Sequence, residues 1–146
     1  MAKGLDARFE DCLQKKKITK LSKAGAMVQK ELRVAREDMS VAEEGLKNKR
    51  WKWSTIQAYY SMFHTARTLL YSAGYREKSH YCLRVALETL FVNAGKLDER
   101  HIDALQIAKV MRENADYEEE FSEQGARKLV LAAKDFIEVT ESILSR

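Results

Sequence analysis

The chain has 146 residues, of which 45% are apolar and 33% charged, and it has a net charge of +4, no proline and six glycines. This length predicts one domain, and the missing prolines argue against a turn-rich β-sandwich or barrel. No apolar run approaches the ~18 residues that a membrane span requires, and the start MAKGLDARFEDCLQKKK lacks the apolar stretch of a secretory signal. Cys12 and Cys82 are too few and too far apart for a disulfide framework or a zinc knuckle, so we expect both to be reduced. The composition therefore predicts a soluble, mostly helical domain of the cytoplasm.

Positive charge is concentrated at the N-terminal end. Residues 1–36 contain ten Lys or Arg against four acids, and the remaining 110 residues carry a net charge of −2. The densest basic stretch is KKKITKLSK, residues 15–23. Clustered lysines favour contact with phosphates, but a solvated, poorly ordered connection before a helix has the same composition. We favour the second interpretation, because a lysine run carries no geometry for reading bases.

The first predicted elements are two helices. A short helix over residues 5–16 places Leu5, Phe9 and Leu13 at four-residue spacing. A second helix runs from Ser22 or Lys23 to about Asn48. Its apolar positions follow a heptad-type stripe, which predicts nearly antiparallel packing against a neighbouring helix. The stripe consists of Val28, Leu32, Ala35, Met39, Ala42 and Leu46.

The third predicted helix, residues 54–73, is the most apolar and is expected at the centre of the fold, with Gly74 at its end. We expect Trp51 and Trp53 in the link before it, and Ser54 or Thr55 as its N-cap.

Three more helices follow. Ser79 caps a helix over residues 80–94, which Gly95 ends, and Asp98 opens a helix over residues 98–115. The acidic stretch DYEEEFSE separates this from a last helix over residues 123–144. Because no window alternates with the period of a strand, the predicted fold class is all-α, an antiparallel up-and-down bundle of four to six helices. We expect a basic N-terminal segment with a short helix, residues 1–21, before a bundle domain, residues 22–146.

Many familiar catalytic signatures are absent from the sequence. It contains no glycine-rich phosphate loop, G-x-S-x-G, H-E-x-x-H or C-x-x-C. The histidines His64, His80 and His101 fall on three different predicted helices, and the nearest second ligand is a weak one, Glu77 near His80. We therefore expect no metal site.

A first candidate site lies on the central helix. Tyr60, His64 and Arg67 occupy one side of adjacent turns, in the run Tyr59-Tyr60-x-x-Phe63-His64-x-x-Arg67. Either these polar groups form hydrogen bonds inside the core, or they line a cleft.

A second candidate site lies at the end of the helix over residues 98–115. Arg112 and Asp116 are spaced as an i, i+4 ion pair, and Tyr117 follows where the helix breaks. An arginine, a carboxylate and a phenol at a helix end suit a phosphate or ribose, although a plain surface ion pair is an equal alternative.

The run YYSMFHTARTLLYSAGYREKSHYCL, followed about thirty residues later by MRENADY, resembles the HEPN domain family. More narrowly, it resembles the prokaryotic subgroup that is often encoded beside a minimal nucleotidyltransferase. The resemblance covers roughly residues 25–145. It implies a HEPN-like bundle that commonly forms a homodimer, with two copies of the motif across one cleft.

The resemblance also bears on activity. Active HEPN ribonucleases cleave RNA without a metal, using an arginine that is followed four to six residues later by a histidine. Arg112 matches the arginine, but Tyr117 stands where the histidine is expected, and a phenol is a poor general base at neutral pH. His80 or His64 can replace it only if the fold brings one of them to Arg112.

We therefore expect a nucleotide- or RNA-binding HEPN domain that acts with a minimal nucleotidyltransferase, as in a toxin–antitoxin pair. We expect it to need no cofactor, and to bind its ligand rather than act as an enzyme on it. In this family the transferase is thought to add nucleotides to a motif tyrosine, which here is Tyr117. The alternatives are a ribonuclease toxin using Arg112 and His80, and a helical dimerisation module. The candidate binding residues are Arg112, Asp116, Tyr117, Tyr60, His64, Arg67 and His80.

Overall fold

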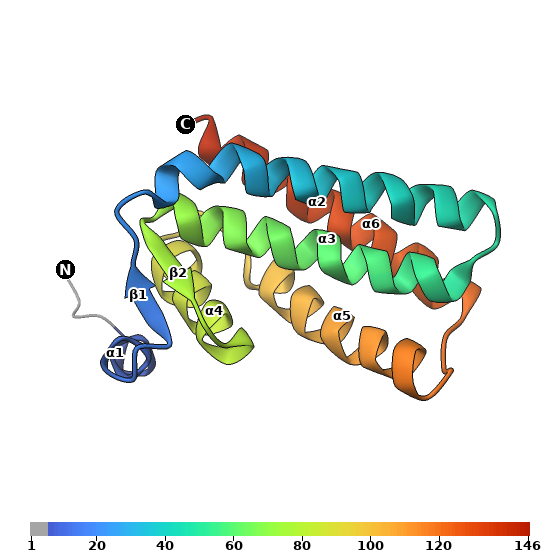
Figure 1. Ribbon diagram of the computed structural model, residues 1–146, viewed down its shortest axis with the longest axis horizontal. Helices are drawn as coiled ribbons and strands as arrows, with labels where there is room; N and C mark the ends of the chain where they lie inside the picture. The colour runs from blue at the N-terminus through green and yellow to red at the C-terminus, as the bar shows by residue number, and fades with distance from the viewer. Residues whose placement is uncertain (1–5) are drawn as a thin grey trace.

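Four long helices pack side by side in the computed structural model, which describes residues 6–146 (Figure 1). They are α2 (Ala24–Lys47), α3 (Trp51–Ser72), α5 (Glu99–Tyr117) and α6 (Glu123–Leu144). The shorter elements are α1 (Ala7–Gln14), β1 (Ile18–Lys20), β2 (Tyr75–Glu77), α4 (His80–Leu87) and the π-helical turn η1 (Glu88–Val92). The predicted all-α bundle is confirmed, and of the predicted first helix only Leu5 lies outside the described residues.

Helix α3 is the centre of the bundle, as its apolar sequence predicts, and it contacts α2, α5 and α6. Small residues on α2 let the two helices approach closely. The Ser61 hydroxyl of α3 donates to the Ala35 carbonyl at 2.8 Å, and the Ser54 hydroxyl donates to the Ala42 carbonyl at 2.9 Å. Buried serines thus find backbone acceptors on the neighbouring helix, which fixes α3 against α2.

The predicted start of α3 is wrong. Trp51 and Trp53 do not lie in a link but in the first turn of the helix. Ser54 and Thr55 are not caps, because Ser54 is buried against α2 and the Thr55 hydroxyl donates to the Trp51 carbonyl at 2.8 Å. The link between α2 and α3 is therefore only three residues long, 48–50, and within it Lys49 adopts a positive φ of 57°.

Other predicted helix ends agree with the structure. The Ser79 and Asp98 side chains accept hydrogen bonds from the backbone N–H groups of Cys82 and Arg100, so both are N-caps. Gly74, with a φ of +87°, follows Ala73, the C-cap of α3. The helix predicted over residues 80–94 is shorter, since the α-helix ends at Leu87 and continues as η1.

A two-stranded sheet was not predicted. Strand β1 pairs antiparallel with β2, with Ile18 opposite Glu77 and Lys20 opposite Tyr75. Part of the basic run is therefore an ordered strand rather than a poorly ordered connection. Three residues per strand are too few to produce a recognisable period of two.

The two cysteines are joined, which corrects the prediction that both are reduced. Cys12 of α1 and Cys82 of α4 form a disulfide with their Cα atoms 5.9 Å apart, across a sequence separation of 70 residues. Phe9 of α1 is fully buried in the same core as the bundle helices. The two cysteines are far apart in the sequence but close in space, because α1 packs against α4.

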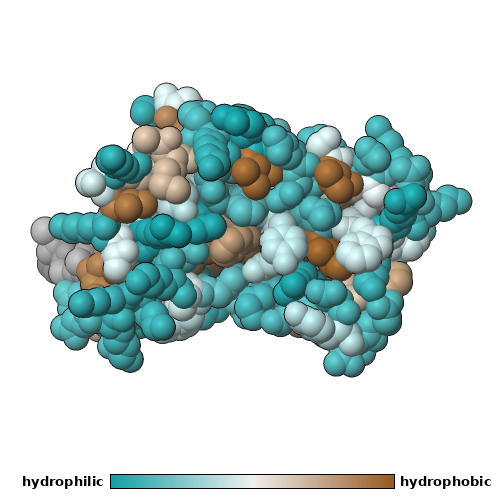
Figure 2. All heavy atoms as spheres, in the orientation of Figure 1, coloured by the Kyte–Doolittle hydropathy of each residue, from teal (hydrophilic) through white to brown (hydrophobic). Residues whose placement is uncertain are grey.

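Two further findings bear on function. Among residues 6–146, no helix combines the length and apolarity needed to cross a bilayer, and no group of three or more His, Cys, Asp or Glu side chains is arranged to hold a metal ion. Figure 2 shows a largely hydrophilic face over α2, α3 and α5, with separate hydrophobic patches between the polar side chains.

Candidate functional site

Arg112, near the end of α5, is the centre of one polar cluster. Its Nη2 atom donates to the Tyr60 hydroxyl of α3 at 3.0 Å and lies 3.2 Å from the Asp116 carboxylate. The guanidinium carbon is 5.5 Å from the Tyr60 ring centre and 5.6 Å from the Tyr117 ring centre. The structure thus brings together four of the seven predicted site residues, Arg112 and the three that contact it, Tyr60, Asp116 and Tyr117.

Arg112 is less exposed to solvent than the Asp116 and Tyr117 side chains beside it. The Arg112 side chain is 23% exposed, the Asp116 side chain 33%, and Tyr117 as a whole 69%. Arg112 Nε is buried and has no hydrogen-bond partner among the described residues. The guanidinium is therefore held in place by protein groups, while a carboxylate and an aromatic ring beside it remain open to a ligand.

His80, the first residue of α4, is connected to this cluster by a series of aromatic side chains in contact with one another. Its imidazole stacks on Tyr59 and on Phe63, each with ring centres 6.2 Å apart, and the Tyr59 ring is 5.1 Å from the Tyr60 ring. His80 Nε2 is buried, and no described residue provides it with a hydrogen-bond partner.

Electrostatics keep the His80 imidazole neutral. Burial is the main cause that lowers the pKa of His80, and the positive charges of Lys109 and Arg84 lower it further, while Glu113 opposes them. Burial likewise raises the pKa of Tyr59, which Arg112 partly counteracts. At neutral pH both side chains are uncharged, with the positive charges of Lys109 and Arg84 near His80 and that of Arg112 near Tyr59.

His64 and Arg67 belong to a different network. His64 Nδ1 lies 2.5 Å from the Glu31 carboxylate, and His64 Nε2 lies 3.8 Å from Asp38, both on α2. Arg67 Nε donates to Glu77 of β2 at 3.2 Å. These bonds hold α2, α3 and β2 together, so two predicted site residues have ionic partners away from Arg112.

Arg67 neutralises the buried carboxylate of Glu77. The Glu77 side chain is only 8% exposed, and burial raises its pKa, an effect that Arg67 counteracts. Without the guanidinium, a buried carboxylate would face the core unpaired.

Two further residues near the site, Lys109 and Glu113, were not among the predicted site residues. They form an ion pair of 3.1 Å on α5, and their charges act on His80. The spacing Lys109, Arg112, Glu113, Asp116 is the i, i+3, i+4, i+7 pattern of one helix face, which could have indicated them.

Comparisons with known proteins agree with this architecture. A model of the HEPN domain family matches residues 28–143. A protein of Methanocaldococcus jannaschii named "Putative toxin" is 27% identical over 112 residues, which cover 76% of this chain and 84% of that protein. A UPF0332 protein of Thermotoga maritima is 27% identical over 114 residues, covering 77% and 86% of the two chains. A UPF0332 protein of Pyrococcus horikoshii is 34% identical over 71 residues, about half of each chain.

Proposed function

Since this chain belongs to the HEPN domain family, we propose that it is a toxin-like HEPN protein that binds RNA or a nucleotide at the Arg112 cluster. It acts as a homodimer and together with a minimal nucleotidyltransferase. The similarity to a protein named "Putative toxin" supports the toxin-like character. The nucleotidyltransferase and the homodimer follow from the resemblance of its motifs to the prokaryotic subgroup.

One observation carries the proposal: Arg112 is held between Tyr60 and Asp116 through a single nitrogen, Nη2. A guanidinium has five N–H donors, so this arrangement orients the side chain and leaves donors for a phosphate. The Asp116 carboxylate can accept a hydrogen bond from a ribose hydroxyl. The exposed Tyr117 ring offers a surface on which an unpaired base can stack.

Binding is tested by fluorescence anisotropy with a labelled single-stranded RNA. We expect Arg112→Ala to weaken binding roughly tenfold or more, about 1.4 kcal/mol. Arg100→Ala is the matched control, because Arg100 is also on α5 but pairs with Asp135 of α6. Equal losses in both variants, or a wild type that binds no RNA or nucleotide, would contradict the proposal.

His80 favours a second candidate function, a metal-independent ribonuclease. Its lowered pKa leaves a neutral imidazole able to take a proton, and its Nε2 has no partner among the described residues. Tyr59 and Tyr60 connect it to Arg112. The test incubates RNA with the protein in the presence of a chelator. Cleavage by the wild type that is lost in both Arg112→Ala and His80→Gln would identify a ribonuclease. RNA that the wild type leaves intact would support the binding function instead.

The nucleotidyltransferase partnership is tested on Tyr117. Its exposed ring at the end of α5 makes the hydroxyl accessible to a modifying enzyme. After co-expression with the cognate transferase, mass spectrometry should find added nucleotide on the wild type and none on Tyr117→Phe. An unmodified Tyr117 beside an active transferase would argue against this partnership.

A further inference from the structure

Part of the basic run, residues 15–23, lies on a two-stranded ribbon that the structure fixes at several points. Strand β1 pairs with β2, and just beyond the paired positions the Lys17 carbonyl accepts a hydrogen bond from the Lys78 N–H at 2.8 Å. The Cys12–Cys82 disulfide joins the helix before β1 to the helix after β2. Figure 1 shows the two strands side by side, with β2 leading into the start of α4. The backbone that carries these lysines is therefore held in place.

One face of the ribbon carries positive charge. Side chains alternate between the two faces of a strand, and directly opposed residues share a face. Ile18 and Glu77 lie opposite one another and are buried. It follows that Lys17, Arg76 and Lys78 lie on the outer face, where all three are exposed.

These cations have no carboxylate of their own. Lys15 pairs with Asp11 at 3.0 Å, but five exposed cations on and beside the strands have no ion-pair partner among residues 6–146. We call them the basic ribbon: Lys16, Lys17, Lys20, Arg76 and Lys78. Lys17 and Lys78 are directly opposed, and like charges in that arrangement destabilise a strand pair. A bound anion would remove this repulsion.

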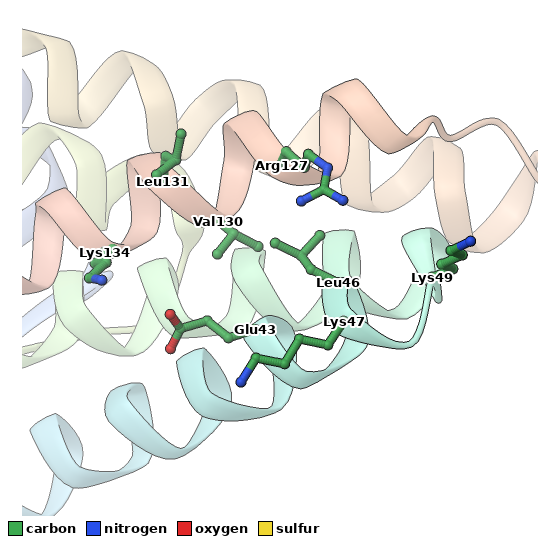
Figure 3. Close-up of a pocket in the computed structure, with 8 residues that line it drawn as sticks. All are labelled: Glu43, Leu46, Lys47, Lys49, Arg127, Val130, Leu131 and Lys134. Atoms are coloured by element: carbon green, nitrogen blue, oxygen red, sulfur yellow. The ribbon is translucent and has the colours of Figure 1, made fainter.

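Cations elsewhere on the surface are arranged differently. A hollow of about 540 Å³ between α2 and α6 has Lys47, Lys134 and Arg127 on its wall, with Glu43 among them (Figure 3). Arg127 also pairs with Glu123 at 2.9 Å. Because the charges there are mixed, a polyanion gains less from that hollow than from the basic ribbon.

The basic ribbon and the Arg112 cluster both contact α3, at different levels of the helix. Arg67 of α3 bonds to Glu77 of β2, and Tyr60 of α3 bonds to Arg112. Seven residues separate Arg67 from Tyr60, which is about 10 Å along the helix axis. His80 stacks against a side chain of α3 between these two levels. A strand of a few nucleotides spans this distance, since even stacked nucleotides advance about 3.4 Å each.

The chemistry of the basic ribbon favours a phosphate backbone. Between the ribbon and Arg112, the positive charges of Arg84 and Lys109 act on His80, so the positive potential continues from one to the other. No large apolar side chain of β1 or β2 is exposed, which leaves an acidic protein segment little to bury there. A mononucleotide has phosphate at one end only and cannot occupy both places.

We propose that the basic ribbon is a second RNA-binding surface, along which the backbone of a strand bound at Arg112 continues. Because it rests on the proposed binding at Arg112, it narrows that ligand to a chain of several nucleotides. Helix α1 and strand β1 lie outside the residues that the HEPN model matches. Half of this surface is therefore an addition to the matched domain.

The test compares a labelled single-stranded RNA of about 12 nucleotides with a labelled mononucleotide by fluorescence anisotropy. The ribbon variant is Lys17→Gln with Arg76→Gln and Lys78→Gln, three exposed side chains. We expect it to weaken binding of the RNA at least about tenfold and to leave mononucleotide binding unchanged. The slope of log affinity against log salt should become shallower by about 2, since each phosphate contact of a single strand contributes about 0.7.

Two controls separate local charge from other effects. Lys47→Gln with Lys128→Gln and Lys134→Gln removes the same charge from exposed positions on α2 and α6, and should bind both ligands like the wild type. Exchanging lysine for arginine, and arginine for lysine, at the three ribbon positions keeps the charge and should also preserve RNA binding.

The outcomes distinguish this surface from the Arg112 site. If Arg112→Ala weakens binding of both ligands while the ribbon variant binds RNA like the wild type, the basic ribbon is not an RNA-binding surface, although Arg112 still binds its ligand. Equal losses in the ribbon variant and in the α2–α6 control would show that net charge alone acts, which also overturns the proposal. A wild type that binds neither ligand contradicts the proposed function, and the ribbon proposal falls with it.

Discussion

Arg112 and Tyr60 lie 52 positions apart in the sequence, and a 3.0 Å hydrogen bond from the guanidinium to the phenol oxygen joins them. The bond connects the end of α5 to the middle of α3. Its acceptor is a hydroxyl whose ring also lies 5.5 Å from the guanidinium carbon, so Tyr60 both orients and covers the arginine. A candidate anion-binding group is thereby held ready before any ligand arrives.

Tyr60→Phe keeps the ring and removes only this acceptor. We expect it to lower the free energy of unfolding by about 1 kcal/mol, and to weaken RNA binding less than Arg112→Ala does. Urea denaturation and anisotropy measure the two effects. Tyr81→Phe is the control, since Tyr81 is half-exposed on α4 and its ring contacts Arg84. Equal effects of both substitutions would show that the Tyr60 hydroxyl has no special role.

Stability should fall as the pH drops below about 6.5, the ordinary histidine value. Burial lowers the pKa of both His80 and His101 in the folded protein, so the unfolded chain binds protons first and acid favours unfolding. The raised pKa of Glu77 acts in the opposite direction at lower pH. Melting temperatures across this range should drop less in His80→Gln and His101→Gln than in the wild type. Parallel pH curves in all three proteins would contradict this.

The disulfide should contribute measurably to stability. It ties α1 to α4 across 70 residues, and a cross-link of that span stabilises by about 4 kcal/mol in the chain-entropy model. Reductant should lower the denaturation midpoint of the wild type and leave that of Cys12→Ser unchanged. Two titratable thiols in folded protein purified without reductant would show that the bond does not form.

Gly45 should be intolerant of a side chain. A Cβ at this position would overlap the Ser54 Oγ atom, whose hydroxyl is already bonded to Ala42. Gly45→Ala should therefore cost about 1–3 kcal/mol by overpacking the α2–α3 contact. Gly25→Ala, on the same helix with nothing within 4 Å of the added carbon, should be neutral or stabilising.

A second substitution distinguishes the cause. Combining Gly45→Ala with Ser54→Ala removes the overlapping oxygen, so part of the lost stability should return in urea denaturation. A double variant that is less stable than both single variants would mean that the clash is not the reason.

Local patterns accounted for most of the fold. The heptad stripe from Val28 to Leu46 predicted α2, and Ser79 and Asp98 were found as caps, because both signals depend only on residues a few positions apart. The start of α3 was missed because Trp51 and Trp53 belong to a first turn without a side-chain cap.

The candidate site was predictable only in part. The i, i+4 spacing of Arg112 and Asp116 indicated their pair, and Tyr117 was found by its place at the helix end. By contrast, Tyr60, His64 and Arg67 share one side of α3, and nothing in that spacing indicates which of them turns to α5 and which to α2.

The sequence by itself determined the fold class of this protein, a bundle of helices with apolar stripes, and the order of its motifs. Only the tertiary structure decided that Arg112 bonds to Tyr60, that His64 pairs with Glu31, and that Cys12 joins Cys82. The physical reason is range. Helix periodicity and capping act within a few residues, whereas these partners meet only after α1 and the bundle helices have packed.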